Sequence, residues 1–478
     1  MEQLGKEIRI HFAGICGVGT SAVAIALHKS GYRVTGSDKG FYPPVSTALE
    51  KAGVTFYAGW HPEQMEQMGT PSMVIAGGGG TSSTNPELKW AEDHNIPILS
   101  FAEFVGKYFV RENSIVTVGT WGKTTCAAIL AHILTEANYD PTFMIGGVPI
   151  GMPSGKLSES DWSVLEGDEY KSAIWDTRAK FSYYSPTHLL LTSVSWDHAD
   201  LYPTEDAYFS AFENLVSSLP ETGLLVACID NPGVRKVIGY AKCRAVTYGT
   251  RSSADYQYVK VGESRDGIRF GIVRGNEATA IESQMIGNFQ AENITGCFVL
   301  AKEIGIPVKT IISCLASFSG IKRRFEKRFE SERLGVTVFD CHAPTPEKAK
   351  SVLRDLRKIY DKEKIIAIYE PNIGGRTPES AVKYTDAFSA ADIVMIPQLT
   401  KLKVDPSVHN KPIDGKDLAK LIARSHSNTQ YIPNDDKLVT ELINLATGWP
   451  SADGTVIVFL GSHSFRTMIE QVVEKLKV

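Results

Sequence analysis

The segment that most constrains the fold of this chain is a glycine loop, Gly119-Thr-Trp-Gly-Lys-Thr-Thr125. The loop follows the apolar run 115–118, and a stretch with helical periodicity, 123–137, comes after it. The order strand, glycine loop, helix is typical of a parallel sheet whose strands are joined by helices. The N-terminus of such a helix and the N–H groups of the loop bind phosphate. We therefore expect an α/β fold with a nucleotide site at this loop.

Each residue type in the loop suits one part of a nucleotide–metal complex. Gly119 and Gly122 let the backbone curl so that its N–H groups face phosphate oxygens. Lys123 supplies a charge for the terminal phosphates, and the Thr124 hydroxyl can ligate Mg²⁺. Thr117 departs from the usual pattern, which has its first glycine at that position. An ordinary strand-to-helix turn would leave Lys123 and the two threonines unexplained, so nucleotide binding is the favoured interpretation.

Three segments of the chain have the pattern of α/β units. The first contains apolar runs at 8–13, 32–36, 73–76 and 97–100, with a helix expected near residue 103. The second is built around the glycine loop, and the third contains apolar runs at 336–339, 364–369, 392–396 and 455–460. We expect domains at 1–110, 111–328 and 329–478, with the Arg- and Glu-rich stretch 322–333 as the second hinge.

A second glycine loop, Gly14-Ile-Cys-Gly-Val-Gly19, follows the first apolar run, and Asp38 lies about twenty residues further on. This arrangement invites a dinucleotide-binding interpretation and, with it, an NAD-dependent oxidoreductase. The spacing is G-x-x-G-x-G, however, and Cys16 stands where the second glycine of the dinucleotide pattern belongs. A loop that cradles the diphosphate of a nucleotide-sugar, or a tight turn with no ligand, remains open.

Acidic residues follow two apolar runs beyond the glycine loop. Glu166, Asp168 and Glu169 end one run, and Asp197-His198-Ala-Asp200 follows the other. The carboxyl ends of parallel strands open into a cleft, where one or two carboxylates together with ATP phosphates suffice to hold Mg²⁺. Glu166 and His198 are the expected ligands of a second metal or of the transferred phosphoryl group. Taken alone, Asp197-His198 would more often be a turn.

Composition excludes several classes of protein. The formal net charge of −4 over 478 residues argues against a nucleic-acid partner, because no excess of Lys and Arg exists to neutralise phosphates. No apolar stretch approaches the roughly 20 residues that cross a bilayer, so no membrane partner is expected. The seven cysteines show no CxxC pair, and the first apolar run lacks a cleavage site. We expect reduced thiols and a cytoplasmic location.

These motifs resemble those of the Mur ligase family of peptidoglycan enzymes. The loop 119–125 resembles the family's G-T-H/N-G-K-T-T sequence, Glu166 falls at its Mg²⁺ glutamate, and Asp197-His198-Ala-Asp200 resembles its D-H-M-D segment. The resemblance implies three domains that bind, in order, a UDP-sugar, ATP and the incoming amine. It also implies an ATP-dependent ligase that activates the carboxylate of UDP-N-acetylmuramate as an acyl phosphate and transfers it to an amino acid or short peptide.

The resemblance also implies roles for particular residues. The ATP site would comprise Gly119, Thr120, Gly122, Lys123, Thr124, Thr125, Asn293, Arg324 and Asp340. Metal would be held by Thr124, Glu166 and His198, and the catalytic residues would be Lys123, Glu166 and His198. The UDP-sugar would be bound by Gly17, Gly19, Ser37, Asp38 and Ser46. The acceptor would be bound by Arg376 and Thr377.

Several positions depart from the family pattern. Trp121 replaces a His or Asn, Phe289-Gln290 replaces His-Asn, and the C-terminal motif Asp340-Cys-His-Ala-Pro-Thr-Pro346 lacks the adjacent histidines of relatives. Tyr42-Pro-Pro-Val-Ser-Thr47 and Ile145-Gly-Gly-Val-Pro149 favour members that add the tripeptide L-Ala-γ-D-Glu-meso-diaminopimelate in peptidoglycan recycling. Addition of L-alanine in de novo synthesis is the main alternative, and a non-catalytic nucleotide-binding homologue is another.

Overall fold

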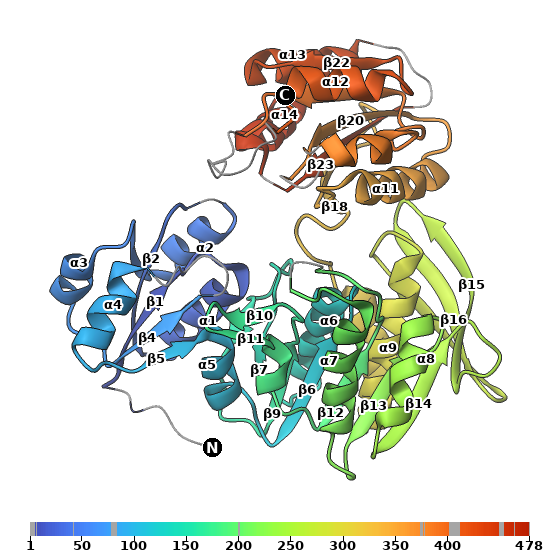
Figure 1. Cartoon of the computed structure of the whole chain (residues 1–478). Coiled ribbons are helices and arrows are strands. Elements are labelled where there is room, and N and C mark those ends of the chain that lie inside the picture. The colour runs from blue at the N-terminus through green and yellow to red at the C-terminus, as the bar shows by residue number, and fades with distance from the viewer. Residues whose placement is uncertain are drawn as a thin grey trace. The chain divides into compact units, whose positions relative to one another are not determined.

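The computed structural model describes residues 5, 7–41, 43–77, 84–198, 201–372, 376, 378–400, 412–448, 454–462 and 464–477 (Figure 1). The chain divides into two compact units. The first comprises Met1–Gly262 and Gly267–Ser319, and the second comprises Glu263–Asp266 and Gly320–Val478. The predicted α/β class is confirmed in both units.

The first unit begins with a parallel five-stranded sheet of order β3-β2-β1-β4-β5. Its strands are β1 (Arg9–Ala13), β2 (Arg33–Asp38), β3 (Thr55–Ala58), β4 (Met73–Ala76) and β5 (Ile98–Ser100). Its helices are α1 (Val18–Lys29), α2 (Val45–Ala52), α3 (Pro62–Gln67), α4 (Pro86–Asp93) and α5 (Phe101–Tyr108). The four apolar runs predicted as strands are confirmed to within two residues at either end, and α5 is the helix expected near residue 103.

The same unit contains a ten-stranded sheet of order β17-β16-β15-β14-β13-β12-β6-β9-β7-β8. Parallel pairing joins β7 (Thr142–Met144), β9 (Trp162–Glu166), β6 (Asn113–Val118), β12 (His188–Leu191), β13 (Leu224–Cys228), β14 (Arg244–Gly249) and β15 (Tyr256–Ser264). Antiparallel pairing joins β16 (Gly267–Arg274) to β17 (Glu277–Ser283) and β8 (Gly155–Lys156) to β7. Its helices are α6 (Lys123–Glu136), α7 (Glu205–Ser217), α8 (Pro232–Val237), α9 (Phe289–Glu303) and α10 (Val308–Ser317).

The central strands of this sheet are buried on both faces. β6, β12 and β13 are almost wholly buried, and α6 and α9, which contact each other, pack against this part of the sheet. A separate two-stranded hairpin, β10 (Lys171–Ala173) and β11 (Asp176–Ala179), follows β9. The glycine loop predicted to bind nucleotide connects β6 to α6, as expected from the order strand, loop, helix.

The second unit contains a six-stranded sheet of order β18-β19-β23-β20-β21-β22. Its strands are β18 (Glu326–Ser331), β19 (Val336–Cys341), β20 (Lys364–Glu370), β21 (Ile393–Pro397), β22 (Thr429–Ile432) and β23 (Thr455–Gly461). All pairs are parallel except β18 with β19. The principal helices are α11 (Pro346–Ile359), α12 (Gly415–Ala423), α13 (Asp435–Thr447) and α14 (Met468–Lys477). All four strands predicted here are confirmed.

Each of the three predicted domains therefore has a sheet of its own. The boundaries at residues 110 and 328 stay predictions, because the first two sheets lie within one compact unit. Within the described ranges, no helix combines the length and the apolar character needed to cross a membrane.

Candidate active site

The glycine loop between β6 and α6 is fixed by contacts that only glycine permits. Gly119 and Gly122 have φ values of 137° and 85°, in the left-handed region. A Cβ atom at Gly122 would lie 2.4 Å from Asn293 Oδ1, and one at Gly119 would lie 2.2 Å from Thr192 Oγ1. The N–H of Thr120 donates to Ser193 O at 3.0 Å, which ties the loop to the end of β12. The backbone approaches its neighbours too closely here for any side chain.

Lys123 lies at the start of α6, and two groups hold its ammonium. Lys123 Nζ donates to Gly119 O at 2.6 Å and pairs with Glu169 Oε2 at 2.8 Å. Glu169 is buried, and its Oε1 lies 3.6 Å from Nε2 of His198. The hydrogen bond to Glu169 raises the pKa of His198 above its ordinary value. Lys123 and His198, both predicted from the sequence, therefore meet at one carboxylate.

Glu169 itself was not among the predicted site residues. The only signal for it was its place in the acidic run after β9, two residues beyond Gly167. Its backbone O also accepts from the Tyr202 hydroxyl at 2.6 Å. The contact partners of a buried carboxylate depend on the folded chain, so spacing alone did not select Glu169 over Asp168.

Glu166 and Thr124 form the predicted metal-binding pair. The Thr124 hydroxyl donates to Glu166 Oε1 at 2.8 Å, and the Gly146 N–H donates to Glu166 Oε2 at 2.6 Å. A carboxylate and a hydroxyl at hydrogen-bond distance beside a phosphate loop are the oxygen ligands that Mg²⁺ prefers. The residues present therefore fit a magnesium ion between the side chains of Thr124 and Glu166.

A cavity of about 380 Å³ lies between Glu166 and the N-terminal glycine loop. It is lined by Gly17, Val18, Gly19, Thr20, Phe101, Met144, Gly146, Glu166, Asp168, Tyr170, Lys180 and Tyr184. Lys180 Nζ pairs with Asp168 Oδ2 at 2.5 Å. Burial acts to raise the pKa of Asp168, but the charge and hydrogen bond of Lys180, together with the charge of Lys123, hold that pKa below its ordinary value. The lining of the cavity thus combines a glycine loop, a lysine and the carboxylate predicted to bind metal.

The other residues predicted for the UDP-sugar lie at the end of β2 and in α2. Asp38 Oδ2 accepts from the Cys16 N–H at 2.9 Å, so this carboxylate supports the glycine loop. Burial raises the pKa of Asp38. The Ser37 hydroxyl donates to Glu87 Oε2 at 2.5 Å and is wholly buried. Ser46 is buried in the first turn of α2. Of the five predicted residues, the structure places Gly17 and Gly19 directly on the cavity.

The predicted nucleotide residue Asn293 lies on α9 against the glycine loop. Its Nδ2 donates to Gln290 Oε1 at 3.2 Å, and its side chain is buried beside Gly122. Thr125 is also buried, and Phe289 at the start of α9 is 45% exposed. The structure therefore brings together Gly119, Thr120, Gly122, Lys123, Thr124 and Asn293.

The remaining predicted residues belong to the second unit. Asp340 is buried between Arg323 Nε at 3.4 Å and Arg328 Nη1 at 3.6 Å, and burial raises its pKa to about 6. Arg324 is exposed in the turn before β18. Arg376 donates to Ile413 O at 3.0 Å and to Thr400 O at 2.9 Å. Thr377 lies outside the described residues. The roles of these residues stay predictions.

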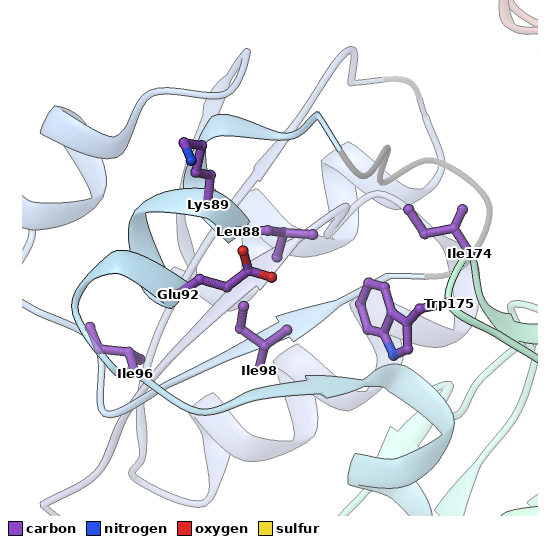
Figure 2. A pocket seen from close by; sticks show the side chains of 7 residues that line it. All are labelled: Leu88, Lys89, Glu92, Ile96, Ile98, Ile174 and Trp175. Atoms are coloured by element: carbon purple, nitrogen blue, oxygen red, sulfur yellow. The ribbon is translucent and has the colours of Figure 1, made fainter.

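An apolar hollow of about 590 Å³ elsewhere in the first unit contains none of the predicted site residues. Figure 2 shows Leu88 and Glu92 of α4 on the side of the helix toward Trp175, which lies at the tip of the β10–β11 hairpin, while Lys89 of the same helix points away. Ile96, Ile98 and Ile174 complete the lining. The β10–β11 hairpin thus forms one side of this hollow, and α4 and β5 contribute to the rest of its lining.

The fold and the loop define a P-loop nucleotide-binding protein of the α/β class. The Mur ligase middle domain matches residues 116–301, and the description "Mur ligase family, catalytic domain" matches residues 9–112. The chain is 32% identical to the UDP-N-acetylmuramate–L-alanine ligase of Arthrobacter sp. (strain FB24) over 411 residues, 85% of this chain and 84% of that protein. It is 30% identical to the same enzyme of Anaeromyxobacter dehalogenans (strain 2CP-1) over 90% of each chain. The chain belongs to the Mur ligase family.

Solved structures show the same fold. The UDP-N-acetylmuramate–alanine ligase of Thermotoga maritima matches 98% of this chain with a TM-score of 0.79 and 22% identity, and 99% of that chain is covered. A murein peptide ligase of Psychrobacter arcticus matches 98% of each chain with a TM-score of 0.69 and 24% identity. The predicted family and three-domain architecture are confirmed. As a family member, the chain is an ATP-dependent ligase that forms an amide bond.

Proposed function

We propose that this chain joins the lactyl carboxylate of UDP-N-acetylmuramate to the amine of L-alanine, with ATP and Mg²⁺. The observation that carries the proposal is the cavity lined by both Gly17 and Glu166. A UDP-sugar whose diphosphate lies on the N-terminal glycine loop would extend its carboxylate toward the metal-binding pair. Lys180 on the cavity wall supplies a positive charge for an anionic substrate.

The chemistry follows from the weakness of a carboxylate as an electrophile. Phosphorylation by ATP converts it into an acyl phosphate; the amine then attacks the carbonyl carbon, and phosphate leaves. Lys123 would move from Glu169 to the γ-phosphate, and the loop N–H groups would hold the β-phosphate. Mg²⁺, held by Thr124 and Glu166, would neutralise charge on the phosphates. The protein thereby positions the reactants and offsets the developing charge.

Two residues would assist without touching the carbonyl carbon. Glu169 holds Lys123 and His198 in one place before ATP binds, so both reach the phosphates already oriented. His198 would serve a second metal. In the three predicted domains, residues 1–110 would bind the sugar, 111–328 the ATP and 329–478 the acceptor, with Arg324 and Asp340 reaching the nucleotide and Arg376 and Thr377 reaching the acceptor.

Two candidate functions within the family differ in the amine that accepts the activated carboxylate. The motifs at 42–47 and 145–149 favoured the tripeptide of peptidoglycan recycling. The relatives reported above, at 30–32% identity, bear the name of L-alanine ligases, which favours L-alanine. L-alanine is therefore the proposed acceptor, and the tripeptide is the second candidate because the murein peptide ligase of Psychrobacter arcticus shares the fold.

Phosphate release from ATP tests the proposal. The protein is mixed with Mg²⁺, UDP-N-acetylmuramate and, separately, L-alanine, L-serine, glycine or the tripeptide. Release with L-alanine alone is expected, and release with the tripeptide alone would replace L-alanine by the second candidate. Lys123→Ala should abolish release, whereas Lys236→Ala, at a lysine that is 63% exposed, should not. Silence of the wild type with every acceptor would overturn the proposed function.

A further inference from the structure

Three side chains with metal-ligating atoms converge where β13 meets α9. Cys228 ends β13, Asp230 follows two residues later, and Glu292 lies in the first turn of α9. One ligand atom from each lies within 4.8 Å of the other two. Cys228 is wholly buried, and both carboxylates are partly buried. These residues share nothing with the Thr124, Glu166 and His198 set.

The Asp230 carboxylate is oriented by the turn after β14 and by Tyr258 of β15. Oδ2 accepts from the Thr250 N–H at 2.7 Å, the Thr250 hydroxyl at 2.9 Å and the Tyr258 hydroxyl at 3.3 Å. Oδ1 accepts from the Arg251 N–H at the longer distance of 3.3 Å. Hydrogen bonds of this kind to one oxygen orient a ligating carboxylate and leave lone pairs of the other for a cation.

Two carboxylates and one thiol lie together in this cluster. The Cys228 thiol is hydrogen-bonded to Glu292, and Asp230 acts on the same carboxylate. In the described part of the chain, no lysine or arginine charge acts on the Glu292 carboxylate. Two carboxylates and a thiol in partial burial are stabilised either by protons or by a bound cation.

A buried hydroxyl next to the cluster independently points to a ligand. Tyr248 pairs with Cys228 across β13 and β14, so their side chains lie on the same face of the sheet. Tyr248 is wholly buried, and its hydroxyl has no hydrogen-bond partner among the described residues. That hydroxyl interacts electrostatically with Cys228 and Glu292. Buried hydroxyls normally have a partner, so a ligand between Tyr248 and the carboxylates would satisfy it.

We propose that Cys228, Asp230 and Glu292 bind a divalent cation of the zinc type. A thiolate with two carboxylate oxygens suits zinc or cobalt better than magnesium, which prefers oxygen alone. Zn–S and Zn–O distances of about 2.3 Å and 2.0 Å place ligand atoms roughly 3.5 Å apart, within reach of small side-chain rotations. The thiol proton leaves to solvent as the metal–sulfur bond forms, and water hydrogen-bonded to the Tyr248 hydroxyl would fill the fourth position. The inference does not depend on the acceptor or on turnover.

Bound at this position, the cation would link α9 to the end of β13. Asn293, the next residue on α9, packs against Gly122 of the phosphate loop. A metal that fixes the first turn of α9 would therefore stabilise the floor of the nucleotide site. The expected ligation differs from that of the proposed magnesium pair because it includes sulfur.

Cobalt titration of the full-length chain tests the site. The protein is treated with a chelator, dialysed and titrated with Co²⁺ in the absence of nucleotide and substrate. A thiolate-to-cobalt charge-transfer band in the near ultraviolet is expected to saturate at one equivalent, and one equivalent of Zn²⁺ should remove it. Cys228→Ser should abolish the band. Cys314→Ser, at another buried cysteine, should retain it.

A second variant guards against misfolding of the first. Glu292→Gln keeps the size of the side chain and should weaken Co²⁺ binding at least tenfold while far-ultraviolet circular dichroism is unchanged. The magnesium pair contains no sulfur, so cobalt bound there gives no thiolate band. Absence of the band in the wild type, or a band unchanged by both Cys228→Ser and Glu292→Gln, would overturn the proposal.

Discussion

The Glu166 carboxylate accepts hydrogen bonds from Thr124 and Gly146, so its position is fixed before any metal binds. Glu166→Gln keeps the side-chain shape but removes the charge that attracts Mg²⁺. We expect the Mg²⁺ concentration for half-maximal phosphate release to rise by on the order of 10–100-fold. A magnesium titration of phosphate release measures this. Glu159→Gln, at an exposed glutamate in the same unit, should leave the titration unchanged; an unchanged titration in Glu166→Gln would remove this residue from the metal site.

We predict that the free energy of unfolding of the metal-free protein depends on pH because of Glu292. Burial raises its pKa from 4.5 to about 7, and the groups around it are Cys228, Asp230, Tyr248 and Tyr258. Glu292 therefore loses its proton at lower pH in the unfolded chain than in the folded one. The free energy of unfolding consequently falls as pH rises between about 4.5 and 7. Glu292→Gln removes this loss, on the order of 3 kcal/mol at most.

Urea unfolding with chelator at pH 5 and pH 8 measures the Glu292 effect. The variant should gain stability relative to the wild type at pH 8 and much less at pH 5. Glu277→Gln, at a glutamate that is 78% exposed, is the control and should show no such difference. An equal effect of Glu292→Gln at both pH values would contradict the prediction.

The residues of the phosphate loop could be predicted from the sequence, because phosphate binding requires these residue types at this spacing. Gly119, Gly122, Lys123 and Thr124 follow one another in the chain, and their contacts are as expected for a phosphate loop. Glu169 was missed because its contact with Lys123 spans 46 positions of sequence. The cluster of Cys228 with Glu292 was missed for the same reason. Pairings of this kind depend on which strand ends meet, and a single sequence does not contain that information.

The capping box of α5 gives a prediction at the scale of one element. The Ser100 hydroxyl accepts from the Glu103 N–H at 3.1 Å, and Glu103 Oε2 accepts from the Ser100 N–H at 2.7 Å. Ser100→Ala removes the first bond and the contact with Ser172 Oγ at 2.8 Å. We expect a loss of about 1–2 kcal/mol of unfolding free energy, measured by urea unfolding. Thr204→Ala, at the exposed cap of α7 with one such bond, should cost less; a greater cost there would contradict the argument.

Strands that are continuous apolar runs were predicted, whereas the parallel strands β3, β13, β14 and β22 and the antiparallel strands β16 to β18 were not. Strands buried on both faces, such as β6 and β20, are continuous apolar runs that stand out from the chain. β15 has an alternating, half-exposed pattern with few buried residues, so its apolar signal in the sequence is weaker. The stretch 322–333, expected to be a hinge, contains β18, which pairs antiparallel with β19. Its charged side chains suit a strand with one exposed edge, and charge alone suggested a linker.

At the scale of the whole molecule, the three sheets follow from the sequence but the compact units do not. Residues Glu263–Asp266 join the second unit although they comprise the end of β15 and the turn to β16, whose other residues belong to the first. Arg265 forms an ion pair with Glu363 and lies 5.0 Å from the centroid of the Tyr360 ring. These contacts connect residues about one hundred positions apart. Local composition therefore indicated the boundary at residue 328 only approximately. The tip of the β15–β16 hairpin was assigned to the central domain.

The two units have separate hydrophobic cores, so calorimetry of the whole chain should show two transitions. The core around Leu442 lies wholly in the second unit. Leu442→Ala should reduce the unfolding free energy of the second unit by about 2–5 kcal/mol. The transition whose temperature falls in this variant is therefore that of the second unit. The cavity proposed for UDP-N-acetylmuramate is lined only by residues of the first unit.

UDP-N-acetylmuramate should therefore raise one transition only. At one hundred times its dissociation constant, a ligand that binds the folded state alone adds about 2.7 kcal/mol. We expect the transition unaffected by Leu442→Ala to rise by several degrees and the other to stay constant, in scans without ATP. Inosine diphosphate, which offers a diphosphate but no muramyl group, is the control and should give a smaller rise. Equal rises of both transitions would mean that the second unit also contacts the sugar, because a ligand stabilises only the cooperative unit whose folded state it binds.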